Sequence, residues 1–252
     1  MSLEVPFFMR QIKLTIEYDG TNYSGWQVQP NGITIQQMIE ESLATMLGEP
    51  VKLHSSGRTD AGVHALGMVA AFKTGKLLPL RAFSYGLNAL LPNDIAIRDA
   101  VEAPLAFNPR ADAKSKHYRY TIYNAVRRSP LARLSSWHLR GALDIERMQA
   151  AAFHFVGEHD FAAFRASNCA AKTTVRRLFS VSVVKDGESV IIDVHGSGFL
   201  KNMVRIIAGT LAEVGQGKIN PDAVPGLLVS GDRAASGITA PPQGLCLVEV
   251  FY

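Results

Sequence analysis

The order of strand-like and helix-like segments is the feature that most constrains the fold of this chain. Residues 12–18 alternate apolar and polar side chains, which is the period of a half-buried strand. Thr34 and Gln37 form a capping-box start, and apolar residues then recur at helical spacing until Gly48. The first part of the chain therefore predicts the β-α-β-β-α-β order of a ferredoxin-like unit, with strands over 12–18, 51–55, 63–72 and 95–101 and helices over 34–48 and 79–90.

The second part of the chain repeats this order with longer insertions and no repeat of the sequence itself. A hairpin is expected around residues 185–187, and Asn220 with Pro221 is a plausible start for a short helix. We predict an α+β protein of two halves, 1–108 and 109–252, whose antiparallel sheets flank a central cleft suited to a ligand. The elements expected in the second half are strands over 116–123, 176–185, 189–195 and 245–252 and helices over 144–155 and 199–214.

The charge distribution favours a polyanionic partner. The chain has 252 residues, 47% of them hydrophobic and 19% charged, which is enough apolar material for a packed core. Residues 1–110 carry nine Lys and Arg against ten Asp and Glu, whereas residues 111–252 carry seventeen against twelve. The stretches 113–143 and 161–185 hold basic residues and no acidic ones. Such stretches attract phosphate-rich ligands, although a solvated basic face explains the same pattern.

Other sequence features limit the cellular setting. We find no run of about 18 apolar residues, so a membrane span is not expected. Residues 1–10 lack a basic segment before an apolar one, so they do not predict a secretory signal. Cys169 and Cys246 are far apart and in no CxxC arrangement, which argues against a disulfide framework or zinc knuckle. A cytoplasmic protein is the expectation.

The densest polar cluster is the segment SGRTDAGVH, residues 56–64, in a predicted loop between two strands. Arg58 and Asp60 present a cation and a carboxylate from this loop, and an ion pair that merely braces it would have the same pattern. A metal site built from His54, Asp60 and His64 is a second alternative. A hydrolytic metal centre usually needs further ligands at matched spacing, which we do not find, so no metal is expected.

Five sequence blocks in order resemble the TruA family of tRNA pseudouridine synthases. They are SGRTDAGVHA together with IEYDGTNYSGWQVQPNGITIQ, KHYRYTIYN, GSGFLKNMVRIIAGTL and TAPPQGLCLVEV. They are spread over nearly the whole chain. The resemblance implies a pseudouridine synthase fold and conversion of uridines 38, 39 and 40 in the tRNA anticodon arm to pseudouridine. It also implies a homodimer, with tRNA as partner and no small-molecule cofactor.

The resemblance also implies roles for individual residues. Asp60 matches the aspartate nucleophile, Arg205 the basic residue paired with it, and Tyr118 the tyrosine that lies against the target base. Leu245 matches an apolar residue that lines the base pocket, and Arg58 an arginine that holds the nucleotide out of its stack. The family's RNA-contacting loops fall at 107–111 and 168–172, where the matching residues are Phe107, Asn108, Arg110, Asn168 and Lys172.

The chemistry of the reaction is consistent with these roles. The N1–C1′ bond must break, the uracil must turn, and C5 must join C1′, without any redox change. A carboxylate can add to C6 of uracil or assist departure at C1′, and the sequence does not distinguish these routes. An aromatic face can replace lost base stacking, which is worth about 1–3 kcal/mol per base.

Two other classes of function remain as alternatives. One is a non-catalytic RNA-binding protein, in which a carboxylate at Asp60 would repel phosphate. The other is a metal-dependent phosphoesterase that uses His54, Asp60 and His64. Each of the candidate side chains also has an ordinary structural role: Tyr118 as a strand residue, Arg205 as a helix surface charge and Leu245 as a core residue.

Overall fold

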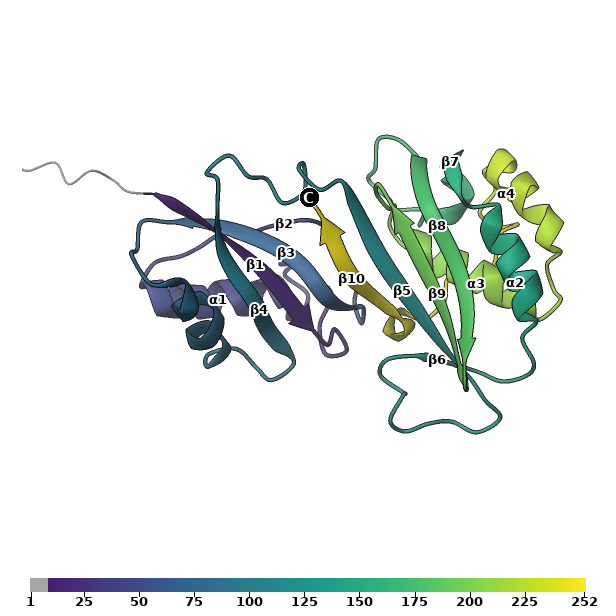
Figure 1. The fold of residues 1–252 in the computed structure, drawn as a ribbon, viewed down its shortest axis with the longest axis horizontal. Coiled ribbons are helices and arrows are strands. Elements are labelled where there is room, and N and C mark those ends of the chain that lie inside the picture. Colours follow the sequence, from purple (N-terminus) through teal and green to yellow (C-terminus); the bar gives the residue numbers. More distant parts are fainter. Residues whose placement is uncertain (1–8) are drawn as a thin grey trace, which may run out of the picture.

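The computed structural model describes residues 9–252, and most of the segment on which the secretory-signal expectation rests, residues 1–8, lies outside them. The strands form one ten-stranded sheet, which runs through the molecule in Figure 1. Their bounds are β1 Arg10–Tyr18, β2 His54–Ser55, β3 His64–Thr74, β4 Ile95–Ala103, β5 Ser115–Asn124, β6 Trp137–Leu139, β7 Gly157–Asp160, β8 Val175–Asp186, β9 Ser189–Gly196 and β10 Leu245–Phe251.

The helices lie against the two parts of this sheet. Thr34 accepts a hydrogen bond from the backbone N–H of Gln37, and Gly48 ends the first helix in the left-handed conformation with φ 71°. In Figure 1 this helix lies beside the strands of the first half, and the other three lie together beside those of the second. The helices are α1 Ile35–Leu47, α2 Ile145–Phe153, α3 Met203–Gly215 and α4 Val224–Ser230, with short helical turns at Ala82–Gly86, Ala162–Phe164, Pro221–Ala223 and Pro242–Gly244.

The sheet joins the two halves through its C-terminal strand. The strand order is β4-β1-β3-β10-β5-β9-β8-β7, with β2 on β3 and β6 on β5. Strand β10 is parallel to β3 and antiparallel to β5. The α+β class and the mostly antiparallel pairing are confirmed. The two sheets that we expected on either side of a cleft are one continuous sheet, because β10 pairs with a strand of each half.

Some helices differ from the expected ones in where they begin or in their type of turn. Helix α3 begins at Met203 rather than at Phe199, because Asn202 before it has φ 62° in the left-handed region. The helix expected over 79–90 includes a π-turn at Ala82–Gly86. Asn220 does cap the turn that begins at Pro221, by accepting from the N–H of Asp222. The division at residue 108 remains a prediction.

Helix α3 is the most deeply enclosed helix among the described residues. Eleven of its residues are buried, and it packs against α2 and β5. Strand β1 shows the expected alternation, with Ile12, Leu14 and Ile16 fully buried. Within residues 9–252, no helix is both long and apolar enough to cross a membrane.

Candidate active site

The loop between β2 and β3 holds Asp60 by its neighbours on both sides. The hydroxyls of Thr59 and Tyr18 are hydrogen-bonded at 2.7 Å, and the N–H of Trp26 donates to the Thr59 carbonyl at 3.1 Å. The N–H of Val63 donates to the Asp60 carbonyl at 3.2 Å and closes a turn. Because Thr59 is buried and bonded at both its backbone and its side chain, the backbone of Asp60 is fixed.

Two glycines allow the segment after β1 to lie directly against this loop. A Cβ atom at Gly20 would come 2.0 Å from the carbonyl oxygen of Val63. A Cβ atom at Gly25 would come 2.7 Å from the carbonyl oxygen of Thr59, and Gly25 also has φ +91°. Both glycines belong to the IEYDGTNYSGW block, so this block supports the Asp60 loop from behind.

Asp60 and Arg205 form an ion pair across the two halves of the chain. Arg205, in the first turn of α3, places Nη1 3.7 Å from Oδ2 of Asp60. The side chains are 28% exposed for Asp60 and 15% for Arg205, so the pair is largely shielded but open to a ligand. Burial lowers the pKa of Arg205, and the Asp60 charge opposes this effect. The guanidinium remains charged at neutral pH and faces the carboxylate.

Tyr118 and Leu245 lie on one face of the sheet, next to this pair. Tyr118 in β5 is 8% exposed, and its ring packs edge-on against Phe199 with centroids 4.9 Å apart. Leu245 pairs with Tyr120, two residues beyond Tyr118, so all three side chains point to the same side. Burial, and then the charge of Asp60, raises the pKa of Tyr118. The phenol is therefore neutral at neutral pH and offers an aromatic surface.

Lys116 is a site residue that the sequence interpretation missed. It lies on the Tyr118 side of β5, and its Nζ donates to the carbonyl oxygen of Ser56 at 2.7 Å. Burial, and then the charge of Arg110, lowers its pKa to about 8. Its position two residues before Tyr118 was a usable signal, because alternate residues of a strand share a face.

Of the expected RNA-contacting residues, some use their side chains in contacts within the protein and others have side chains exposed to solvent. Phe107 is half-buried against Tyr252, with ring centroids 5.1 Å apart. The side-chain oxygen Oδ1 of Asn108 accepts from the backbone N–H groups of Arg110 and Ala111 and so stabilises its own turn. Four of the expected residues are exposed and available to a ligand: Arg58, Arg110, Asn168 and Lys172.

The ligand set of the alternative metal site is not brought together. His54 is exposed on β2. The His64 ring lies 3.0 Å from Oδ1 of Asp19 through Nδ1 and 3.2 Å from the Gln243 carbonyl through Nε2. Over residues 9–252, no three His, Cys, Asp or Glu side chains cluster as metal ligands would. His64 instead links the first half to the segment before β10.

The site as a whole combines a carboxylate, a guanidinium and a buried aromatic ring, contributed by both halves of an α+β sheet. This combination suits covalent or acid-base chemistry on a planar group that lies against the ring. The exposed basic residues near it suit a polyanionic substrate. The site thus has the character of an enzyme that acts on a base within a nucleic acid.

Comparison with known proteins identifies the family. The pattern of the tRNA pseudouridine synthase family matches residues 14–110 and 151–252. The chain is 97% identical over 244 residues to tRNA pseudouridine synthase A of Geotalea uraniireducens, covering 97% of this chain and 100% of that protein. It is 79% identical over 244 residues to the protein of the same name from Geotalea daltonii, with the same coverage. The chain belongs to the tRNA pseudouridine synthase family, whose members are isomerases that act on tRNA.

A solved structure of a Cbf5-Nop10-Gar1 complex aligns with 93% of this chain and 57% of the matched chain, at 12% identity. The TM-score of this alignment is 0.38.

Proposed function

We propose that this enzyme converts uridines 38, 39 and 40 of the tRNA anticodon arm to pseudouridine, with Asp60 as nucleophile and the target base turned out of its stack. The positions come from the resemblance to the family. The observation that carries the chemical assignment is the Asp60–Arg205 pair at 3.7 Å beside the buried ring of Tyr118. We propose that the enzyme acts in the cytoplasm, where tRNA is processed.

The residues divide the reaction between them. Asp60, paired with Arg205, attacks C6 of uracil or assists departure at C1′. The N1–C1′ bond breaks, the uracil turns against Tyr118 and Leu245, and C5 bonds to C1′. The C5 hydrogen leaves as a proton, N1 takes up a proton, and any bond that Asp60 formed to the substrate breaks, which leaves the carboxylate free. The neutral phenol of Tyr118 replaces part of the stacking that the base loses, worth about 1–3 kcal/mol. Arg58 is exposed on the same loop as Asp60 and holds the nucleotide out of its stack.

The direct test measures release of tritium from tRNA transcribed with C5-labelled uridine, since this reaction must liberate the C5 hydrogen. We expect release by the parent protein and none by Asp60→Asn, with tRNA affinity within about tenfold because phosphate contacts supply it. Asp186→Asn, at an exposed aspartate that ends β8, is the matched control and should release tritium at the parent rate. Release by Asp60→Asn above a few per cent of the parent rate would refute the nucleophile role.

We also propose that the enzyme is a homodimer, as the resemblance implies, so that one tRNA contacts two subunits. Light scattering coupled to size-exclusion chromatography tests this: a mass near twice 27.4 kDa is expected. A monomer at micromolar concentration would refute it.

A further inference from the structure

The segment 231–244, between α4 and β10, runs along α3 and is here called the strap. The N–H of Ala240 donates to the Arg205 carbonyl at 3.1 Å, and the N–H of Gly237 donates to the Thr210 hydroxyl at 3.0 Å. The Pro241 carbonyl accepts from the Tyr120 hydroxyl at 2.8 Å. The strap therefore connects the helix that carries Arg205 with the sheet face that carries Tyr118.

The strap and α3 meet backbone against backbone. A Cβ atom at Gly209 of α3 would come 1.9 Å from the carbonyl oxygen of Ile238. A Cβ atom at Gly237 of the strap would come 2.5 Å from Cα of Thr210. At both points the nearest atoms are backbone atoms, which cannot turn aside as the end of a side chain can, so a change in either segment shifts the other.

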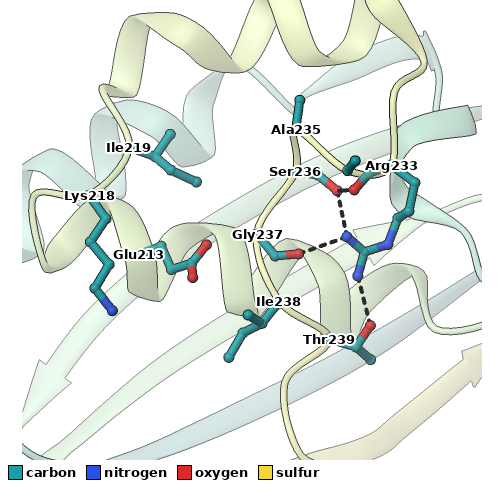
Figure 2. Close-up of a pocket in the computed structure, with 10 residues that line it drawn as sticks. Glu213, Lys218, Ile219, Arg233, Ala235, Ser236, Gly237, Ile238 and Thr239 are labelled. Carbon is teal, nitrogen blue, oxygen red and sulfur yellow. Dashed lines mark hydrogen bonds between the residues drawn. The ribbon is translucent and has the colours of Figure 1, made fainter.

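Arg233 closes the first part of the strap on itself. Figure 2 shows its guanidinium turned into the loop, where Nη1 donates to the Ser236 hydroxyl and the Gly237 carbonyl, and Nη2 to the Thr239 hydroxyl, each at 2.9 Å. A hollow of about 620 Å³ is lined by strap residues 233–239, Arg233 included, and by Glu213, Lys218 and Ile219. Because the strap borders this hollow instead of packing against other segments there, the hydrogen bonds of Arg233 help to hold its shape, together with the Ser236 hydroxyl, which donates to the Ala163 carbonyl at 2.9 Å.

The far end of the strap orients the guanidinium of Arg205. Nε of Arg205 donates to the Ala240 carbonyl at 2.8 Å, and Nη1 donates to Oδ1 of Asn202 at 3.1 Å. Because the strap holds Nε, the planar guanidinium of Arg205 is fixed in one orientation. In this orientation its Nη1 lies 3.7 Å from Oδ2 of Asp60. The Ala240 carbonyl is thus placed by the strap and in turn places the cation beside the carboxylate.

We propose that Arg233 is a positioning residue for the reaction: it fixes the strap against α3 so that the Ala240 carbonyl holds Arg205 toward Asp60. This inference rests on the proposed function, because it assigns Arg233 an effect only through the Asp60–Arg205 pair. The hydrogen bonds of Arg233 are all made within the strap and involve neither Asp60 nor Tyr118.

The test measures single-turnover rates at saturating tRNA, tRNA affinity and thermal unfolding for Arg233→Met, Arg205→Met and the double variant. We expect Arg233→Met to slow the chemical step at least about tenfold, since a small misplacement of a reacting group has a large effect. Its tRNA affinity should stay within about twofold of the parent, because no phosphate-binding side chain is changed. In the Arg205→Met background, Arg233→Met should change the rate less than about twofold. Arg233→Lys should not restore the rate, because an ammonium lacks the planar fork.

A second variant gives the same information through the backbone contact. Gly209→Ala places a methyl group against the Ile238 carbonyl and should slow the chemical step with tRNA affinity preserved. Gly226→Ala is the matched control, because it is also helical and its Cβ atom would meet nothing within 4 Å. Alanine has a higher helix propensity than glycine. Helix propensity alone therefore predicts no loss of stability for either variant.

Parent-like rates for both Arg233→Met and Gly209→Ala would overturn the inference, as would an equal loss from Arg233→Met in both backgrounds. A fall in rate explained entirely by unfolding at the assay temperature would also overturn it. Failure of the proposed function has a different signature: Arg205→Met or Asp60→Asn would then retain the parent rate. If those two variants are slow while the strap variants are not, only the positioning role is wrong.

Discussion

The loop that carries Asp60 and the loops that carry the exposed basic residues are built in opposite ways. Thr59, next to Asp60, is buried and hydrogen-bonded through both side chain and backbone, and glycines lie directly behind the loop. Arg110 and Lys172 lie on loops where their side chains are exposed. The difference indicates that the chemical groups are fixed before substrate arrives, whereas the side chains proposed to contact RNA are free to adapt to it.

The largest effect is expected at the centre of the fixed region. Arg205→Met should lower the rate of pseudouridine formation by about 100-fold, because the carboxylate loses its preorganised cation in a shielded site. Tritium release under single-turnover conditions measures this. The control is Arg98→Met, which removes a more exposed arginine that lies 3.3 Å from Glu17. An exposed pair contributes little, so this variant should keep the parent rate; equal losses in both would contradict the comparison.

The next largest effect is expected at Gly25, which lies directly behind the Asp60 loop. Gly25→Ala should lower the free energy of unfolding by about 2–4 kcal/mol, because it combines backbone strain with a collision against the Thr59 carbonyl. Gly48→Ala separates these two causes, since Gly48 also has positive φ but a Cβ atom there meets nothing within 4 Å. It should cost only about 1–2 kcal/mol. Urea unfolding measures both, and equal values would show that the collision has no effect.

Substitutions in the exposed loops should change the affinity for tRNA more than the rate of the chemical step. Charge reversal at Arg110 or Lys172 should weaken tRNA binding and reduce the slope of log K against log salt by roughly 0.7–0.9 for each lost phosphate contact. The single-turnover rate at saturating tRNA should change much less. Lys76→Glu is the control, an exposed lysine of the first half outside both loops. If all three variants show the parent slope, the RNA follows a different path, and the 113–143 stretch is the next surface to test.

At Lys116, which lies between the two regions, the expected effect is confined to alkaline pH and to stability. Its pKa falls from 10.5 to about 8 in the folded protein because of burial and the nearby charge of Arg110. Between pH 8 and 10.5 the unfolded chain therefore holds a proton that the folded protein has lost, so folding becomes more favourable as pH rises. Relative to Lys116→Met, the parent should gain about 1–3 kcal/mol of unfolding free energy over this range. A pH-independent difference would show that the lysine is not shielded.

Local patterns in the sequence predicted most of the elements, because strand and helix periods are properties of neighbouring residues. The cap at Thr34, the hairpin near Gly187 and the strand that carries Tyr118 are examples. The resemblance supplied Asp60, Arg205, Tyr118 and Leu245, and the structure brings these four side chains into one region. Their assigned roles stay predictions.

Contacts between distant segments were not predictable in this way. Nothing in the period of residues 245–251 indicates that they pair with β3, about 180 positions earlier along the chain. The hydrogen bonds of Arg233 depend on the path of a loop, and an isolated arginine after a helix has no distinctive pattern. Lys116 was grouped with other basic residues because sequence alone does not reveal that its Nζ reaches the Ser56 carbonyl.

The central place of β10 has a consequence for how the molecule folds. Cys246 pairs with His64, so the sheet cannot close until a strand that follows all the others in sequence has inserted between β3 and β5. Contacts this far apart in sequence slow folding, and until they form, the parts of β3 and β5 that β2 and β6 do not cover each have an unpaired edge. Nascent chains that lack β10 therefore expose these unpaired strand segments and lack the strand that joins the half carrying Asp60 to the half carrying Tyr118. Assembly of the site and protection against aggregation are the same late event.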